Sequence, residues 1–205
     1  MKLLQTNRPM RQALLGLALA LSGAAQAADW QLTALTGLDK GYALNNQGLV
    51  VGQTDSRATS WRNGLAVTLA EPPGGASFGS VAIAVSPLGV MAGDGGNLRG
   101  ANWTAGGLTP LGVLREGVRT WAEGLNDFNS VGFTSYANDR TQATQWNLAG
   151  QPTLLTGLAN TQHSRAYGIN QAGQVVGWNG GAQFVDNFSR AVIWNQGQVS
   201  PLYTP

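Results

Sequence analysis

The sequence predicts an all-β fold, a β-propeller-like array of four-stranded antiparallel blades built from about four repeats of roughly 40–45 residues. Three recurring segments predict it. A Gly- and Ala-rich segment ends in Asn or Ser, a Val-rich segment then ends in Gly, and a third segment ends in Trp. Self-similarity with a period of this length is typical of folds in which each repeat forms one small sheet.

Residues 1–27 have the three parts of an export signal. Lys2, Arg8 and Arg11 supply positive charge, the apolar run ALLGLALALSGAA follows, and Ala25-Gln26-Ala27 has the spacing of a cleavage site. The apolar run is shorter than the ~20 residues that a spanning helix needs. We therefore expect cleavage rather than a membrane anchor, and an exported protein that is secreted or periplasmic.

We expect residues 28–205 to form a single repeat domain. Its repeats are predicted at about 41–80, 81–120, 121–164 and 165–205, with an extra outer strand at 30–38. Loss of the signal removes three of the twelve Lys and Arg residues and none of the ten Asp and Glu residues, which leaves 9 against 10. This near-equal balance lacks the excess positive charge with which proteins bind the phosphates of nucleic acid. The sequence contains no Cys, which excludes disulfides and thiolate metal sites.

The repeats align at four turn residues that are 41, 40 and 44 positions apart: Asn45, Ser86, Asn126 and Asn170. Further positions recur in each unit, namely the glycines Gly52, Gly93, Gly132 and Gly177, the tryptophans Trp61, Trp103, Trp146 and Trp194, and the leucines Leu69, Leu111, Leu155 and Leu202. These landmarks divide each unit into four short strands, A to D. We interpret the repeated tryptophans as core residues between blades.

The turn between strands A and B predicts a hairpin. A type I turn favours Asn or Ser at its first position, and a three-residue hairpin loop needs a left-handed residue at its end. That end position holds Gly48, Gly89, Asn129 and Gly173 in the four repeats. Because Asn tolerates the left-handed conformation best after Gly, we expect the same bulged hairpin in every repeat.

The strand compositions predict a radial order. Strand A alternates Gly or Ala with larger residues, and such small residues are poor strand formers that indicate crowding. Strand D carries Pro110, Pro152 or Pro201, and proline removes a donor from the ladder, so D is expected at an edge. Strand A is therefore predicted innermost and strand D outermost. An open array that closes by oligomerising is the alternative to a closed ring.

These motifs resemble the HAF family of extracellular repeats, whose unit reads roughly small-x-[AG]-[IL]-N-x-x-G-x-V-V-G, followed after a gap by [RA]-A-x-x-W-x-x-G. The best match is RAYGINQAGQVVGW with SRAVIWNQGQVSPL, and the resemblance covers about 41–202. Repeats two and three depart from the pattern at Ser86-Pro87 and at Asn129, where one residue is also missing before Gly132. The resemblance implies an exported protein with propeller-like blades, and no established activity.

The loops that vary between repeats are the BC and DA connections, which lie on one face if strand direction alternates. Variable loops on a constant scaffold are where binding usually occurs. Aromatic and basic residues outside the repeat pattern fall in these loops and form the candidate ligand-binding set: Trp121, Trp178, Tyr136, Phe184, Phe188, Arg115 and Arg119. Aromatic rings beside polar donors can stack on a sugar or hold a peptide. For Trp121 and Trp178 the simpler interpretation is that they fill gaps between blades.

Each BC loop also carries an aspartate, namely Asp55, Asp94, Asp139 and Asp186. Four carboxylates can surround a cation, and AGDGGN around Asp94 is similar to a calcium turn. We interpret them instead as turn residues whose neighbouring arginines form surface or interblade pairs. We therefore expect no metal or other cofactor, with calcium as the alternative.

Catalytic motifs find little support in the sequence. The one histidine, His163, is expected to be an ordinary loop residue, and there is no Cys, G-x-S-x-G, H-E-x-x-H or phosphate-binding loop. We expect a non-enzymatic binding or scaffolding module whose partner, an extracellular glycan or protein, contacts the BC/DA face. The alternatives are a polysaccharide-active or calcium-dependent enzyme that uses the loop aspartates, and a self-associating surface or matrix protein.

Overall fold

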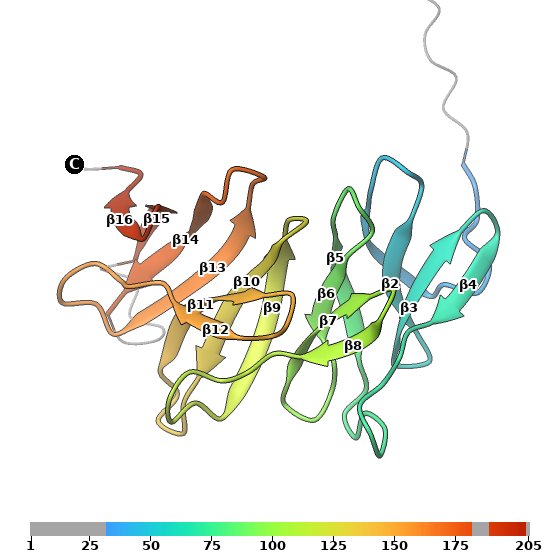
Figure 1. Ribbon diagram of the computed structural model, residues 1–205, viewed down its shortest axis with the longest axis horizontal. Helices are drawn as coiled ribbons and strands as arrows, with labels where there is room; N and C mark the ends of the chain where they lie inside the picture. Colours follow the sequence, from blue (N-terminus) through green and yellow to red (C-terminus); the bar gives the residue numbers. More distant parts are fainter. Residues whose placement is uncertain (1–31, 182–188, 204–205) are drawn as a thin grey trace, which may run out of the picture. The chain divides into compact units, whose positions relative to one another are not determined.

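The computed structural model describes residues 32–181 and 189–203 (Figure 1). The chain divides into Met1–Ala34 and a compact unit, Leu35–Pro205, that contains every described strand. The described residues form sixteen strands in four antiparallel sheets of four, and no helix. In the same residues there is accordingly no helix with the length and apolar character needed to cross a membrane. The predicted all-β class and the four-stranded repeats are confirmed.

Each sheet is built from consecutive strands in chain order. The first holds β1 (Lys40–Leu44), β2 (Val50–Thr54), β3 (Arg57–Arg62) and β4 (Leu65–Thr68). The second holds β5 (Val81–Val85), β6 (Met91–Asp94), β7 (Gly100–Thr104) and β8 (Gly107–Pro110). The third holds β9 (Arg119–Leu125), β10 (Asn129–Ser135), β11 (Thr141–Asn147) and β12 (Pro152–Leu154), and the fourth holds β13 (His163–Ile169), β14 (Val175–Gly180), β15 (Arg190–Asn195) and β16 (Gln198–Pro201). Strand D lies at an edge of every sheet, as its prolines predict.

Strand A of every sheet contains a β-bulge, which the alternating pattern did not predict. The register against strand B shifts by one residue at Tyr42, Ile83, Glu123 and Tyr167. The repeated glycine of strand B makes this possible. A Cβ on Gly52, Gly93, Gly132 or Gly177 would lie 1.7, 2.0, 1.9 or 2.0 Å from a strand A carbonyl oxygen. No other residue type has room at these four positions.

Three of the four AB turns have the predicted geometry. Gly48, Gly89 and Gly173 have φ values of 73°, 86° and 80°, and each donates its N–H to the carbonyl of the first turn residue. The prediction for Asn129 is wrong: this residue starts β10 and is not in the left-handed conformation. The one-residue deletion removes the bulge position, so Asn126 bonds directly to the Asn129 carbonyl, at 2.9 Å.

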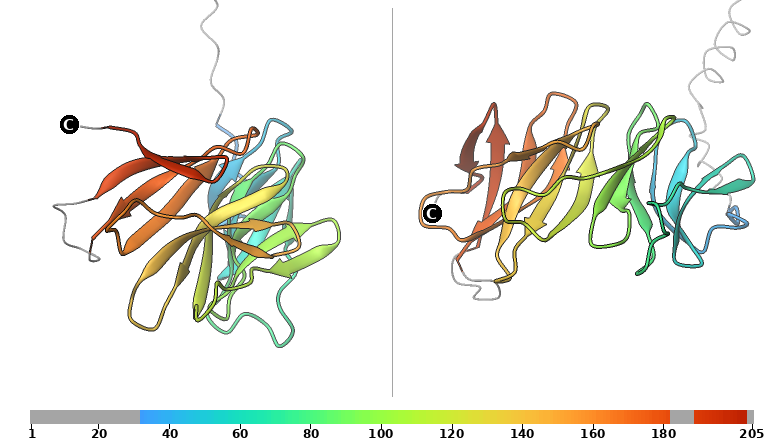
Figure 2. Two further views of the ribbon diagram at one scale, coloured as in Figure 1. Left: turned by 60° about the vertical axis from the view of Figure 1, so that its left-hand side comes forward. Right: turned by 60° about the horizontal axis from the view of Figure 1, so that its bottom comes forward.

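The sheets pack in chain order, each against the next, through the first strand of the later sheet (Figures 1 and 2). Consecutive A strands also contact one another, along β1, β5, β9 and β13. No comparably extensive strand contact in the described part joins the fourth sheet to the first. The four sheets therefore form an open row within Leu35–Pro205.

We call the side of a sheet that packs on the following sheet its forward face, and the opposite side its rear face. Three apolar cores fill the three junctions between faces. The first is Val51, Ala58, Ala82, Ala101 and Trp103; the second is Ala92, Leu111, Ala122 and Trp146; the third is Val131, Ala143, Leu155, Ala166, Val175, Val192 and Trp194. The predicted role of the repeated tryptophans between sheets is confirmed for Trp103, Trp146 and Trp194, which are at most 1% exposed.

Each buried tryptophan also ties its sheet to the preceding repeat by a hydrogen bond. The indole N–H groups of Trp103, Trp146 and Trp194 donate to the carbonyls of Ala70, Gly112 and Thr156, at 2.8, 2.6 and 2.8 Å. The acceptor each time follows the closing leucine of strand D. Trp61 has no preceding sheet, and its Nε1 atom is shielded from solvent without an acceptor in the described residues.

The AB turns are tied together as well. The Asn45 amide donates to the Ser86 carbonyl at 2.9 Å, and the Asn126 amide donates to the Asn170 carbonyl at 2.8 Å. Between the second and third repeats, the Asp127 carboxylate accepts the Leu88 N–H at 2.9 Å. The recurrent Asn thus serves both its own turn and the next repeat.

Other sequence expectations do not hold. Residues 32–38, part of the expected outer strand at 30–38, form no strand, because each sheet already has its four strands and no edge pairs with this segment; residues 30 and 31 lie outside the described part. Trp121 and Trp178 lie within β9 and β14 rather than in loops. His163 starts β13 and is buried rather than being a loop residue.

The tryptophan hydrogen bonds give a test with an internal control. Trp146→Phe removes the donor to Gly112 and leaves that carbonyl unpaired, so we expect a loss of about 1–3 kcal/mol in unfolding free energy. Trp61→Phe removes a donor that has no acceptor, so its cost should be less than half as large. Urea unfolding of dilute protein measures both, and equal losses would contradict the assignment.

Candidate functional site

The BC and DA connections meet on one face, as the strand directions predict. The Ser80 N–H donates to the Ser56 carbonyl at 2.8 Å, and the Gln162 N–H donates to the Gly180 carbonyl at 2.9 Å. The two kinds of loop also join across repeats, since the Asn97 amide donates to the Gly75 carbonyl at 2.8 Å. We call this surface the loop face.

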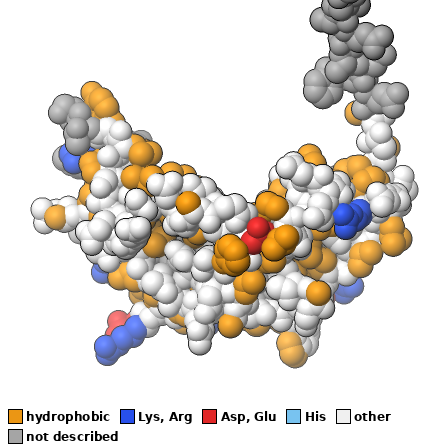
Figure 3. All heavy atoms as spheres, turned by 45° about the horizontal axis from the view of Figure 1, so that its top comes forward, with side chains coloured by type: hydrophobic (Ala, Val, Ile, Leu, Met, Phe, Trp, Pro, Cys, Tyr) orange, Lys and Arg blue, Asp and Glu red, His pale blue; other side chains and the backbone are white. Residues whose placement is uncertain are grey.

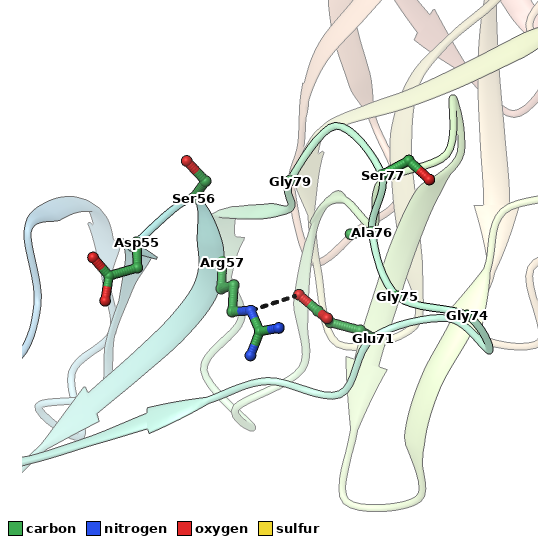
Figure 4. A pocket seen from close by; sticks show the side chains of 9 residues that line it. All are labelled: Asp55, Ser56, Arg57, Glu71, Gly74, Gly75, Ala76, Ser77 and Gly79. Atoms are coloured by element: carbon green, nitrogen blue, oxygen red, sulfur yellow. Dashed lines mark ion pairs between the residues drawn. The ribbon is translucent and has the colours of Figure 1, made fainter.

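A pocket of about 290 Å³ opens on the loop face in the first repeat (Figure 4). Its walls are the BC turn that leads into β3 and the connection that follows β4. The lining residues are Asp55, Ser56, Arg57, Glu71, Gly74, Gly75, Ala76, Ser77 and Gly79. Four of the nine are Gly or Ala, so backbone groups form much of the surface. The lining provides charged groups and hydroxyls and no aromatic ring.

An ion pair crosses this pocket. Arg57 Nε lies 3.4 Å from Glu71 Oε1, with the arginine side chain 59% exposed and the glutamate side chain 18% exposed. Figure 4 shows the two side chains pointing toward one another, whereas the Asp55 carboxylate points away from them. The pocket therefore presents a donor and an acceptor side by side to any polar group that enters.

The local chain conformation holds this pocket open. Asp55 and Ser56 both adopt positive φ, at 49° and 60°, which makes the tight turn before β3. On the opposite wall Gly79 has a φ of 77°, and a Cβ there would lie 2.6 Å from the Ser56 carbonyl oxygen. The Asn97 side chain, from the second repeat, also accepts the Ser77 N–H at 2.9 Å. The wall is thus fixed by its neighbouring repeat.

A second pocket of about 220 Å³ occupies the equivalent position in the third repeat. Arg140 and Gln142 line one side, and the connection 154–164, which includes His163, lines the other. Burial and the charges of Arg140 and Arg165 lower the pKa of His163. Its imidazole is therefore neutral at physiological pH. The repeat thus places a pocket at the same point of its fold twice.

Arg119 and Trp121, two of the predicted binding residues, lie together at the junction of the second and third sheets. Arg119 forms an ion pair with Asp94 of β6 at 3.3 Å, and its guanidinium lies 5.0 Å from the centre of the Trp121 ring. Asp94 also accepts the Gly96 N–H at 2.9 Å. Burial raises the pKa of the Asp94 carboxyl against the opposing effects of Gly96 and Arg119.

The remaining predicted binding residues do not gather at either pocket. Tyr136 lies in the β10–β11 turn and donates its hydroxyl to Gln142. Arg115 is almost fully exposed and pairs with Glu116 at 3.7 Å. Trp178 lies on the fourth sheet and donates to the Tyr167 hydroxyl at 3.1 Å. Phe184, Phe188 and the predicted metal candidate Asp186 lie outside the described residues.

The three described loop aspartates all take part in turns. Asp55 and Asp139 adopt positive φ, and Asp94 caps the Gly96 N–H. Within residues 32–181 and 189–203, no group of three or more His, Cys, Asp or Glu side chains is placed to hold a metal ion. Of their neighbouring arginines, Arg99 and Arg140 donate to the Val118 and Gln162 carbonyls, each in the connection just before the first strand of the following sheet.

The sequence pattern did not reveal the residues of the first pocket as a set. Glu71 and Ser77 lie in an irregular connection where no repeat position marks them. The available signal was PPGGASFG, a run in which three glycines adopt positive φ and shape one wall: Gly74, Gly75 and Gly79. Their spacing is typical of a shaped loop, but the opposite wall comes from a turn about 20 residues earlier.

Comparison with known proteins gives no further assignment, because neither a protein-family model nor a curated protein matches this chain.

Asp94 gives a prediction with a defined sign. A carboxyl whose pKa is higher in the folded protein than in the unfolded chain destabilises the fold once it ionises, from its ordinary value of 3.8 upward. Asp94→Asn keeps the acceptor for Gly96 and removes the charge. We therefore expect the stability of the variant relative to the wild type to increase between pH 3 and pH 7. Chemical unfolding at both pH values measures this difference, and a difference independent of pH would contradict the burial argument.

Proposed function

We propose that this protein is an exported, non-enzymatic binding or scaffolding module, and that an extracellular glycan or protein contacts its loop face. The observation that carries the proposal is the first pocket, with its Arg57–Glu71 pair and glycine-shaped wall. The HAF-type character of the repeats and a propeller-like arrangement of the blades are part of the same proposal.

The size and lining of the pocket favour a single small polar group. A volume of about 290 Å³ is close to the lower end for ligand pockets. A guanidinium and a carboxylate 3.4 Å apart match adjacent hydroxyls, one accepting from Arg57 and the other donating to Glu71. A sugar unit of a longer glycan satisfies both conditions. The equivalent pocket of the third repeat offers a second contact point for a chain-like partner.

An enzyme that uses the loop aspartates receives less support. Asp55, Asp94 and Asp139 come from three different repeats, and each is committed to its own turn. General acid and base catalysis needs two such groups around one substrate bond. In Figure 4 the Asp55 carboxylate also points away from the Arg57–Glu71 pair.

A binding screen with matched variants tests the proposal. The probes are a panel of extracellular polysaccharides and a panel of extracellular proteins. We expect Arg57→Gln with Glu71→Gln to weaken binding at least about tenfold, because charge-assisted hydrogen bonds are lost. Arg62→Gln is the control, since Arg62 bonds to Gln47 beside the AB turn and does not line the pocket.

The three possible outcomes of the screen distinguish binding at the loop face from binding elsewhere and from no binding. Loss of binding in the pocket variant with retention in the control supports the loop face as the site. Equal binding by all three proteins would place the partner elsewhere, and the absence of any bound probe would remove the support for the proposal. Circular dichroism of each variant checks that the fold is intact.

A further inference from the structure

We propose that the protein associates head to tail with a second copy of itself, through the forward face of the fourth sheet and the rear face of the first. The contact is the junction that the chain already builds three times, repeated once more between molecules. This inference does not depend on the loop-face site, because it concerns the two ends of the row of sheets.

The forward face of the fourth sheet is apolar, and no sheet of the described residues packs on it. At one strand B position Val51, Ala92 and Val131 are 0% exposed, whereas the equivalent Val176 is 41% exposed. The closing Leu111 and Leu155 are buried under the next sheet, and the equivalent Leu202 is 57% exposed. Leu202 nevertheless makes the same backbone hydrogen bond, to Ala191, that Leu155 makes to Ala143. The repeat is therefore complete and lacks only its neighbour.

On the rear face of the first sheet, Leu35 and Leu38 approach Gly41, but no sheet of the described residues packs there. The small residues of strand A that are 0% exposed in later repeats are Ala82, Ala122 and Ala166, and the equivalent Gly41 is exposed. Leu44 is 71% exposed, although its counterparts Val85 and Ile169 pack against the junction cores. Figure 3 shows hydrophobic side chains at both ends of the row, over the first and the fourth sheets.

Polar groups at the two ends lack the partners that the internal junctions provide. The shielded Nε1 atom of Trp61 has no acceptor in the described residues, whereas its three counterparts donate to the residue after a closing leucine. The equivalent of that acceptor in the fourth repeat is the carbonyl of Tyr203. Asn170 likewise has no following turn, and its amide donates to Gln174 of its own turn at 2.8 Å. The Asn45 carbonyl of a second copy is its equivalent acceptor.

A cation and an aromatic ring complete the match. At the third junction the Arg165 guanidinium lies 4.1 Å from the centre of the Phe133 ring. Strand pairing makes Trp178 the fourth-repeat equivalent of Phe133, and Lys40 the first-repeat equivalent of Arg165. Trp178 is on the free forward face, and the exposed Lys40 is on the first sheet. Head-to-tail packing therefore places a lysine against a tryptophan, a favourable pair.

These features identify the partner as another copy. Each unmatched group at one end corresponds to a group at the other end of the same chain: Trp61 to Tyr203, Lys40 to Trp178, and Leu44 to the apolar forward face. Two different patches that fit one another make a heterologous contact, which closes a ring or extends a series. A different protein would have to reproduce this set of partners.

The mass of the full chain in solution tests the proposal, by sedimentation or light scattering over a range of concentrations. We expect the wild type to exceed the mass of one chain as concentration rises. Val176→Arg and Leu44→Arg each place a charge on one free face, at positions that are exposed in the single chain, and we expect both to remain single chains. Phe128→Arg, in the AB turn of the third repeat, is the control and should associate like the wild type.

Mixing the two variants tests the direction of the contact. Val176→Arg keeps an intact rear face and Leu44→Arg keeps an intact forward face, so an equimolar mixture should form a two-chain complex that neither protein forms alone. Lys40→Gln should weaken wild-type association about tenfold through loss of the contact with Trp178.

Three results would overturn the proposal. One is a wild type that stays a single chain at all concentrations, which includes the case in which residues 1–34 cover the first sheet. Another is association that survives both arginine substitutions. The third is a mixture of the two variants that remains single chains, which would indicate a symmetric contact between like faces or a different surface.

Discussion

The close approach of strand B glycine to strand A is the constraint on which the rest of the structure depends. At Gly52, Gly93, Gly132 and Gly177 a side chain would collide with a backbone oxygen of the neighbouring strand. The missing side chain admits a β-bulge in strand A, which increases local twist and changes the side-chain alternation. The small residue that pairs with each glycine is buried in the junction at Ala82, Ala122 and Ala166. The spacing between sheets therefore depends on one glycine per repeat.

Much of this fold could be predicted from the sequence because the same pattern of turn, glycine and tryptophan positions recurs in four repeats. A turn signal such as Asn170-Gln171-Ala172-Gly173 is weak alone, but its recurrence identified the strands, their order and the tryptophan cores. Features that depend on a single repeat were predicted less well. Asn129 is tolerant of the left-handed conformation, yet the deletion beside it removed the position where that conformation is needed. The bulge at Tyr42 was not predicted, because it results from a contact between two strands and not from the conformational preference of the residues around it.

The candidate site was predictable as a face and not as a set of residues. Alternating strand direction is enough to put BC and DA loops together, and the hydrogen bond between Ser80 and Ser56 shows the result. Which side chains meet depends on the path of an irregular connection, and nothing in the repeat pattern marks Glu71 as the partner of Arg57. Trp121 and Trp178 stand out in the sequence, but strand extension draws both into the sheets. Aromatic residues that break the repeat pattern therefore lie in strands of this fold as readily as in loops.

The open row of sheets determines where unfolding of the protein begins. Within the described residues each sheet makes its extensive contacts with its neighbours in the row, so its stability depends on how many of its faces are covered. The second and third sheets are held on two sides, and the first and fourth on one. Fraying accordingly begins at the terminal sheets and advances inward one repeat at a time. The second and third sheets, with Trp146 buried at the junction between them, are the last part of the molecule to unfold.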